Sequence, residues 1–305
     1  MRIAVTGASG FLGSRLVTAL RTDGHQVVRL VRRAPRSPEE ARWDPAAGTV
    51  DSGALTGTDA VVHLAGVSVG SRRWTPAFKE EILRSRVDGT RTIATALAAM
   101  PVKPSVLVSA SAIGWYGDTR DAAVDESAPA ATGYFADVVR QWEEATRPAA
   151  DAGVRVVRLR TGLVIGAEGG LLAAPIPVPV VTVSLLQLFK LGLGGTLGNG
   201  KQWMSWVSVD DEIAAMRFAI DSNLSGPVNV TAPQPVTNRE FTRALAHAVH
   251  RPAVARVPAP AIKLLAGEFG DDILTSQNVQ PRVLTDAGFT FRHPTIDEAL
   301  ATALR

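Results

Sequence analysis

The amino-acid sequence predicts an α/β protein in which a doubly wound parallel sheet carries a smaller C-terminal subdomain. Three observations indicate this class. Short β-branched runs alternate with helical segments as far as Arg160, a glycine-rich turn joins the first run to the first helical segment, and after Gly166 the rhythm changes to Gly- and Pro-rich segments. Strands that alternate with helices form a parallel sheet covered on both faces.

The individual elements follow in order along the chain. The predicted strands of the first half are Arg2–Thr6, Gln26–Val31, Ala60–Leu64, Ser105–Ser109 and Arg155–Arg160, and the predicted helices are Phe11–Arg21, Thr75–Met100 and Phe135–Ala150. Further on we expect a helix over Asp210–Asp221, a strand over Pro227–Val230 and a helix over Asn238–His250. Thr237 would cap that last helix, because Glu240 follows three residues later.

Composition excludes several classes of protein. The chain has 305 residues and no cysteine, so disulfides, thiolate nucleophiles and cysteine zinc sites are absent. The net charge is +3 and the longest basic runs are pairs, Arg32-Arg33 and Arg72-Arg73, so we expect no nucleic-acid partner. His247 and His250 lack an acidic or cysteine companion and read as a surface pair, so no metal site is predicted.

The sequence predicts no membrane segment. The apolar stretch Leu171–Phe189 contains Pro175, Pro177 and Pro179, which favour an extended or hinge segment over a spanning helix. The chain opens directly on a predicted strand, without a charged and apolar leader, and we therefore expect a cytoplasmic protein.

The turn from Gly7 to Gly13 has the pattern of a phosphate-binding loop. Gly7 permits a tight turn, Gly10 allows a pyrophosphate to approach the backbone, and Gly13 lets the helix sit close to the strand. The unpaired N–H groups at the helix N-terminus would face the anion. The predicted contacts in this turn are Gly7, Ser9, Gly10, Phe11, Leu12 and Gly13. A glycine-rich turn that binds nothing is the alternative.

Three further motifs accompany this turn: His63-Leu64-Ala65-Gly66, Trp115-Tyr116-Gly117-Asp118, and the run from Trp206 to Asp211. With them the chain resembles the extended branch of the short-chain dehydrogenase/reductase superfamily, the NAD(P)-dependent epimerase/dehydratase-like proteins. The resemblance implies a Rossmann-like fold with a nicotinamide dinucleotide lying across the sheet. It also implies cofactor contacts at Leu64, Ala65, Gly66, Glu81, Arg86, Arg160 and Val164.

The match to one poorly characterised subgroup, the epimerase family proteins, covers essentially the whole chain. It rests on Arg72-Arg73-Trp74, on the run from Gly198 to Trp206, and on the tail from Ala287 to Pro294. The segment Ala174–Ser184 resembles a proline-rich insertion relative to that subgroup. We place an NADP-binding domain at residues 1–170, to which 207–235 return, and a substrate-side lid and subdomain at 171–206 and 236–305.

Charge at the end of the second strand favours NADP(H) over NAD(H). An NAD site needs a carboxylate about 20 residues past the glycines, whereas a 2′-phosphate needs cations. Here Arg32 and Arg33 end the strand and no acid occurs before Glu39. The alternative reading is two solvated arginines on a loop.

The usual catalytic pair of the superfamily, a tyrosine with a lysine four residues on, is missing. Tyr116 and Tyr134 are the two tyrosines; Val138 follows Tyr134 by four residues, and a register set by Glu143 gives Phe135 and Val139. No lysine lies between Lys103 and Lys190. An unshifted tyrosine needs roughly 4 kcal/mol of electrostatic help to ionise fully at neutral pH.

We nevertheless expect chemistry at the carboxyl end of the predicted strand Ser105–Ser109, beside the switch point where ligands bind. Ser111 would orient the reacting oxygen, and Tyr116 or Tyr134 would transfer the proton. The alternative, which the sequence supports equally, is that Tyr116 lines the nicotinamide pocket. Asp118 and Glu126 read as solvated loop acids.

Arg86 is a second departure, because extended members of the superfamily usually carry asparagine there. Its permanent charge would partly replace the missing lysine or clamp the pyrophosphate. An exposed helix arginine is the alternative.

On the substrate side we expect an aromatic wall with anion anchors for a small molecule. Trp74, Trp203 and Trp206 would form the wall, and Arg73 and Lys201 would hold a flat or phosphorylated ligand. Packing in a core competes with contact for each tryptophan. The sequence leaves open whether the protein forms a homodimer through the helices Thr75–Met100 and Phe135–Ala150.

Two functions fit the sequence. The first is an NADP(H)-dependent oxidoreductase or epimerase that acts on a carbonyl or sugar-like molecule. The second is an NADP(H)-binding regulator or sensor that keeps the groove and has lost the catalytic pair.

Overall fold

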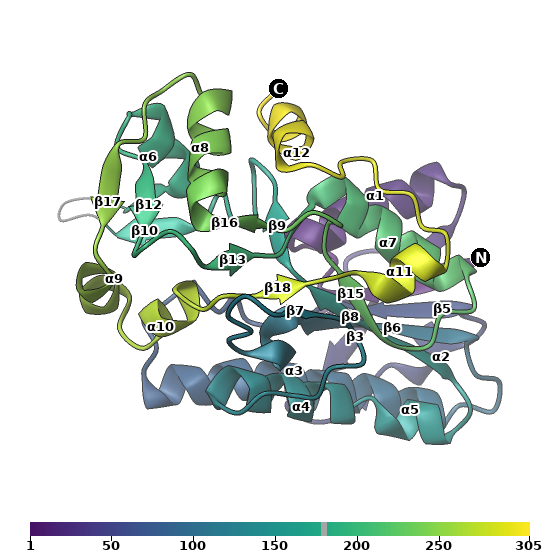
Figure 1. Ribbon diagram of the computed structural model, residues 1–305. Coiled ribbons are helices and arrows are strands. Elements are labelled where there is room, and N and C mark those ends of the chain that lie inside the picture. The colour runs from purple at the N-terminus through teal and green to yellow at the C-terminus, as the bar shows by residue number, and fades with distance from the viewer. Residues whose placement is uncertain (178–181) are drawn as a thin grey trace.

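The computed structural model describes residues 1–177 and 182–305, and it is built on one large sheet (Figure 1). The sheet order is β15-β8-β6-β5-β1-β2-β3-β4. All neighbours pair in parallel except β3 and β4. The strands are β1 (Arg2–Thr6), β2 (Gln26–Val31), β3 (Glu40–Asp44), β4 (Thr49–Val50), β5 (Ala60–His63), β6 (Val106–Ala112), β8 (Arg155–Thr161) and β15 (Gly226–Val230).

Helices cover both faces of this sheet, which confirms the doubly wound class. One face packs against α1 (Phe11–Thr22), α7 (Val209–Asp221) and α11 (Arg282–Asp286). The other face packs against α3 (Pro76–Ala98) and α5 (Arg147–Asp151), with α2 (Ser52–Leu55) and α4 (Tyr134–Glu144) nearby. Central strand residues such as Ile3, Val61 and Val108 are fully buried, because each strand of a two-faced parallel sheet is covered on both sides.

A second lobe lies above the carboxyl edge of the sheet in Figure 1. Its core gathers around Trp206, Phe189, Phe241 and Leu300. The helices of this lobe are α6 (Leu185–Lys190), α8 (Asn238–Ala248), α9 (Ala259–Ala266), α10 (Phe269–Ile273) and α12 (Ile296–Ala303). Its strands are β10 (Pro175–Pro177), β11 (Thr182–Ser184), β12 (Gly195–Leu197), β13 (Trp203–Met204), β16 (Val236–Thr237) and β17 (Ala255–Val257).

Short parallel pairs tie the second lobe to the sheet. β9 (Leu163–Ile165) pairs with β14 (Trp206–Ser208), and β7 (Ala123–Val124) pairs with β18 (Asn278–Val279). The tail then returns to the sheet, where Leu284 joins the core beneath α1 and α7. The C-terminal residues therefore belong partly to the sheet side, whereas the sequence-based boundary placed all of 236–305 in the smaller subdomain.

Most predicted elements are confirmed within two residues, and two differ. The predicted helix Phe135–Ala150 is two helices, because Pro148 at the start of α5 has no N–H to continue the ladder of α4. The strand predicted to end at Ser109 continues to Ala112, into the 3-10 helix η1 (Ile113–Tyr116). The predicted cap is confirmed, since Thr237 and Glu240 form a capping box on α8.

The proline-rich segment 174–184 is described on both sides of its centre. β10 and β11 form an antiparallel pair, with Pro175 opposite Ser184. Pro179, which the hinge prediction includes, lies outside the described residues. Among the residues that the structure describes, no helix has both the length and the apolar character needed to cross a bilayer.

Candidate functional site

The glycine turn between β1 and α1 uses its three glycines for different purposes. Gly7 has φ +66°, and a Cβ there would lie 2.9 Å from the Leu64 carbonyl carbon. A Cβ on Gly13 would overlap the Gly7 carbonyl oxygen. The chain's own packing therefore requires both glycines. A Cβ on Gly10 would meet only the Gly7 oxygen, at 3.3 Å, and Gly10 faces solvent. Packing within the chain therefore does not require glycine at position 10, and the missing side chain leaves space for a ligand.

The N-terminus of α1 is suited to bind an anion. Gly10 is the N-cap and supplies no side-chain hydrogen bond, and the first turn of α1 holds no acidic residue. The first N–H groups of a helix point away from it and carry partial positive charge. Phe11, at the start of α1, would overlap a Cβ at Gly166, so its ring is a packing residue beside the turn.

A surface hollow of about 750 Å³ opens beside this turn, between α1 and α7. Ser9 and Gly10 contribute to its wall. The arginines in its wall pair with carboxylates; Arg15 binds Glu168 at 2.8 Å and Arg292 lies 3.7 Å from Asp210. Within this hollow the remaining positive character is therefore that of the α1 N–H groups.

The two arginines at the end of β2 have different surroundings. Arg33 donates two hydrogen bonds to the Glu40 carboxylate, at 2.8 and 2.7 Å. Glu40 is buried, and these bonds, with one from the Arg36 N–H, lower its pKa to about 2. Arg32 is exposed, and the structure gives it no hydrogen-bond or ion-pair partner among the described residues. The predicted pair of equivalent cations is thus one anchored arginine and one available arginine.

The loop after β5 lies against the glycine turn. The Thr6 hydroxyl oxygen accepts hydrogen bonds from the N–H groups of Leu64 (3.1 Å) and Ala65 (3.3 Å) and lies 2.8 Å from His63 Nδ1. Complete burial lowers the pKa of His63 to about 4, so the ring is neutral at pH 7. Gly66 follows and is exposed at the carboxyl edge.

Arg86 projects from α3 toward this loop. It is 8% exposed, and a Cβ on Gly66 would lie 3.7 Å from its guanidinium carbon. Nη1 donates to the Ile82 carbonyl at 3.2 Å, and the Trp142 ring lies 5.0 Å away. Its buried Nε has no hydrogen-bond partner in the part of the chain that the structure describes. The predicted alternative, an exposed helix arginine, is therefore wrong.

Ser111 and Tyr116 belong to one buried hydrogen-bond network. Ser111 donates to the Glu143 carboxylate at 2.7 Å, and Arg160 binds that carboxylate at 2.7 and 2.9 Å. Arg160 Nη1 donates to the Tyr116 oxygen at 2.9 Å, and the Tyr116 hydroxyl donates to Asn229 Oδ1 at 2.7 Å. Burial raises the pKa of Tyr116, against the opposing effect of Arg160. The phenol is therefore protonated at neutral pH.

Tyr134 lies in an aromatic cluster between α3 and α4. Its hydroxyl donates to the Lys79 carbonyl at 2.7 Å, and its ring meets Trp74 edge to face at 5.2 Å. Phe135, which takes the tyrosine position in the register set by Glu143, would overlap a Cβ at Gly114, so its ring covers the end of β6. Ser111, Tyr116 and Tyr134 thus all have hydroxyls bound within the protein, and their catalytic roles stay predictions.

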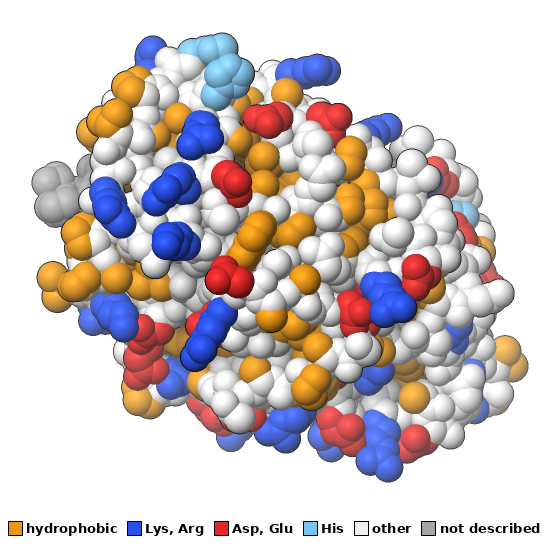
Figure 2. All heavy atoms as spheres, in the orientation of Figure 1, with side chains coloured by type: hydrophobic (Ala, Val, Ile, Leu, Met, Phe, Trp, Pro, Cys, Tyr) orange, Lys and Arg blue, Asp and Glu red, His pale blue; other side chains and the backbone are white. Residues whose placement is uncertain are grey.

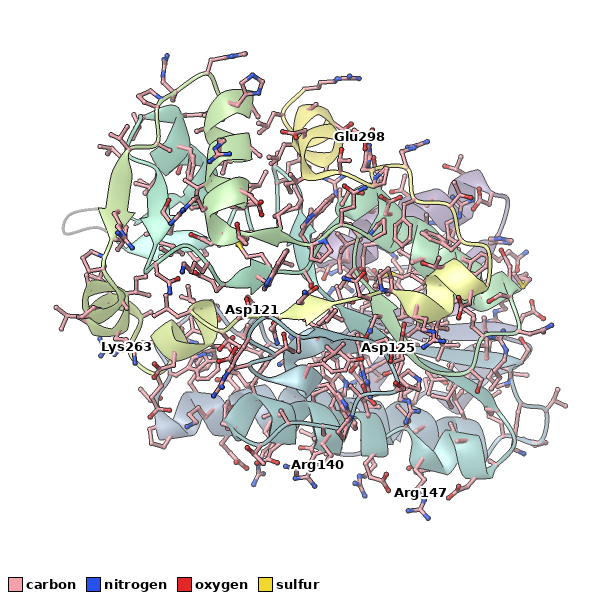
Figure 3. The ribbon with its side chains drawn as sticks, viewed as in Figure 1. Asp121, Asp125, Arg140, Arg147, Lys263 and Glu298 are labelled. Carbon is pink, nitrogen blue, oxygen red and sulfur yellow. The ribbon has the colours of Figure 1, made fainter. Side chains whose placement is uncertain are left out.

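The five predicted substrate residues do not form one wall. Trp206 is fully buried and its indole N–H donates to the Gln234 carbonyl, so its predicted place in the wall is wrong: packing in the second lobe determines its position. Trp74 is buried in the aromatic cluster. Trp203 lies between the lobes, where it donates to Asp121, labelled in Figure 3. Arg73 and Lys201 are exposed.

Two other predicted cofactor contacts, Glu81 and Val164, interact with other parts of the protein. Glu81 is exposed and binds Arg72 through both carboxylate oxygens. Val164 is half-buried on β9 beside the core under α1. No cluster of potential metal ligands occurs within the ranges 1–177 and 182–305.

Sequence reasoning missed several buried polar groups. Asn229 and the ion-pairing role of Glu143 were not predicted, although charged Arg158 and Arg160 in the parallel strand β8 signal that a carboxylate must face them. Glu212 is fully buried on α7; Thr161 donates to it at 2.9 Å, and desolvation raises its pKa to about 8.

A mostly parallel α/β sheet with a glycine turn and an uncapped helix N-terminus after its first strand defines a dinucleotide-binding protein of the Rossmann-like class. The chain belongs to the NAD dependent epimerase/dehydratase family, which residues 3–231 match, and residues 257–303 match a domain of unknown function, DUF1731. The chain is 47% identical over 303 residues to Epimerase family protein Mb2239 of Mycobacterium bovis, which covers 99% of this chain and 97% of that protein.

The solved structures agree in fold. Human epimerase family protein SDR39U1, crystallised with NADPH, superposes with a TM-score of 0.88 at 31% identity and covers 99% of both chains. A UDP-glucose 4-epimerase from Thermus thermophilus superposes with a TM-score of 0.73 at 22% identity, covering 100% of this chain and 98% of that one. The Rossmann-like fold predicted from the sequence is confirmed.

Proposed function

We propose that this protein binds NADP(H) across the carboxyl edge of its sheet and reduces a small carbonyl or sugar-like molecule. The observation that carries the proposal is the position of an open glycine turn after β1 beside an exposed Arg32 at the end of the neighbouring strand β2, where Arg32 has no partner among the described residues. The NADPH in the crystals of human SDR39U1 supports it.

The residues at this edge fit the cofactor. The α1 N–H groups would hold the pyrophosphate, and Arg32 would hold the 2′-phosphate. Gly66 has no side chain and would let the cofactor approach the backbone there. Arg33 would hold the loop in place through Glu40. When bound, the cofactor supplies or accepts a hydride at the nicotinamide C4.

Tyr116 is the proposed proton donor. Carbonyl reduction requires a proton at the substrate oxygen, and this phenol keeps its proton at neutral pH because burial raises its pKa. The Arg160 guanidinium, 2.9 Å from the phenol oxygen, provides the positive charge that the family's lysine would otherwise provide. To deliver the proton, the phenol must exchange its hydrogen bond to Asn229 for one to the substrate.

Charge in the second lobe supports an anionic substrate. On the face shown in Figure 2, Lys and Arg side chains gather over α8 and β12. Lys201 and Arg239 are both exposed around Asn199, and Arg239 donates to the Asn199 carbonyl at 3.2 Å. A phosphate or carboxylate on the substrate would meet these cations.

A second candidate function is an NADP(H)-responsive regulator. It is favoured by the internal hydrogen bonds of Ser111, Tyr116 and Tyr134. It is also favoured by the valine, Val138 or Val139, that either register places where the superfamily has its lysine. In both functions the partner is a small molecule. The homodimer through α3 and α4 and the cytoplasmic location stay predictions, and sedimentation of the purified protein tests the first.

Calorimetric titration of NADPH and NADH tests the cofactor assignment that both functions share. Wild type should bind NADPH more tightly, and Arg32→Ala should weaken NADPH about tenfold while leaving NADH unchanged, since one guanidinium–phosphate pair contributes about 1.5 kcal/mol or more. Arg243→Ala on α8 removes the same charge far from the edge and should change neither. Tighter binding of NADH by wild type would overturn the cofactor assignment.

Absorbance of the reduced nicotinamide, followed with a broad panel of aldehydes, ketones and keto-sugars, tests the reaction. Oxidation of NADPH by any member supports the reductase, and loss of that activity in Tyr116→Phe supports the proton donor. Tight NADPH binding without oxidation across the panel would contradict the reductase and favour the regulator.

A further inference from the structure

Arg86 is a buried cation that has no counter-ion within residues 1–177 and 182–305. Among the described residues its one hydrogen bond goes to the Ile82 carbonyl of its own helix, its Nε has no partner, and no carboxylate lies within ion-pair distance. The nearby Glu143 carboxylate is bound by Arg160 and Ser111. Burial lowers the pKa of Arg86 to about 10, which still leaves the guanidinium charged at neutral pH.

The position of this charge along the sheet edge is defined by the strand order. The strands run β2-β1-β5-β6, with Arg32 at the end of β2, Gly10 beyond β1, and Gly66 beyond β5. Arg86 lies against Gly66. A dinucleotide held at Arg32 by its 2′-phosphate and at α1 by its pyrophosphate therefore directs its nicotinamide toward β5 and β6, where Arg86 lies.

The groups that face Arg86 do not neutralise it. Trp142 presents its ring, Gly66 its backbone, and Tyr134 a neutral phenol whose hydroxyl is bound to Lys79. The nicotinamide ring carries a positive charge when oxidised and none when reduced, whereas the phosphates are the same in both forms. A fixed cation in a poorly solvated environment therefore repels the oxidised nicotinamide ring and does not repel the reduced ring.

We propose that Arg86 makes the groove select the reduced cofactor, so that the protein binds NADPH in preference to NADP⁺. This inference rests on the proposed NADP(H) site and adds a preference for the reduced form of the cofactor. Preference for the reduced form suits a protein that delivers hydride to a substrate, or one that responds to the ratio of NADPH to NADP⁺.

The test compares dissociation constants for NADPH, NADP⁺ and adenosine 2′,5′-bisphosphate, a fragment that lacks the nicotinamide. Wild type should bind NADPH about tenfold more tightly than NADP⁺, the effect of a unit charge at roughly 10 Å in a partly screened site. Arg86→Met keeps the side-chain length and removes the charge, so the two constants should become nearly equal. Binding of the fragment should change little.

Two further variants control for packing and for surface charge. Arg86→Lys keeps a cation and should preserve the preference for NADPH even if overall affinity falls. Arg84→Met, on the exposed side of the same helix, should leave all three constants unchanged.

Each outcome decides a different question. Equal constants for NADPH and NADP⁺ in wild type, or an unchanged ratio in Arg86→Met, would overturn the inference while leaving the cofactor site intact. If Arg86→Met does not fold, the wild-type ratio and the Arg86→Lys ratio still decide it. Failure of wild type to bind any of the three ligands would instead overturn the proposed function.

Discussion

Replacing Gly10 by alanine separates what the turn needs for folding from what it needs for a ligand. Gly10 has φ −76°, which alanine adopts without strain, and the new Cβ would meet one atom at 3.3 Å. The weaker N-cap and the reduced entropy of the unfolded chain oppose each other, each by about 1 kcal/mol or less. We therefore expect the free energy of unfolding to stay within about 1 kcal/mol of wild type.

Gly13→Ala is the matched opposite case. Its Cβ would lie 2.8 Å from the Gly7 carbonyl carbon and 2.9 Å from the Ala8 Cα, backbone atoms that move only if the turn opens. Overpacking of this kind costs about 3 kcal/mol. The Tm should fall by roughly 6–12 °C, because each kcal/mol shifts the Tm of a chain of this size class by roughly 2–4 °C.

Thermal unfolding with and without NADPH measures both effects. A ligand at a hundred times its Kd stabilises the folded state by about 2.7 kcal/mol, so the Tm of wild type should rise by roughly 5–10 °C. Gly10→Ala should keep the unliganded Tm and lose most of that rise, because its methyl group occupies the place where the pyrophosphate meets the helix. A Gly10→Ala protein stabilised by NADPH like wild type would refute this account of the turn.

The remaining predictions concern buried and anchored charges. Burial raises the pKa of Glu212 from 4.5 to about 8, so the stability that this carboxyl contributes is complete below pH 4.5 and is lost as the pH rises to 8. The free energy of unfolding of Glu212→Gln should therefore rise relative to that of wild type by up to about 1.4 kcal/mol per pH unit in this window. Urea unfolding at pH 5, 6.5 and 8 measures the difference. Arg160→Leu leaves the buried Glu143 carboxylate with only the Ser111 hydrogen bond and the longer, 3.9 Å contact to Arg158, and it should lower the free energy of unfolding by about 3 kcal/mol. A loss below about 1 kcal/mol would contradict the network. Arg33→Ala should destabilise the protein at pH 7, and acid titration should show the difference from wild type shrinking as pH falls from 4.5 through 2, because the pKa of Glu40 is held low by that arginine.

The fold was predictable because local signals and packing agree. β-branched runs bounded by glycine turns predicted β1 and β2 with the bounds that the structure has, and the Thr237–Glu240 spacing predicted the capping box of α8. In such segments the residues that favour an element also supply the surface that it buries.

The site was predictable only in part, because its chemistry depends on contacts between distant segments. Nothing local distinguishes Arg32 from Arg33; the difference arises when β3 brings Glu40 beside the second arginine. Similarly, Ser111 follows the strand pattern of a site residue, but its hydroxyl direction is set by Glu143, 32 residues away. Trp206 shares a motif with site residues and packs in a core.

The returning tail has a consequence for how the molecule unfolds. Asp211, at the start of α7, accepts hydrogen bonds from the N–H groups of Arg292 and His293, and β18 pairs with β7. Because the chain crosses between the lobes several times, we expect the two lobes to unfold together. Denaturant titrations followed by tryptophan emission and by circular dichroism should therefore give one coincident transition rather than two.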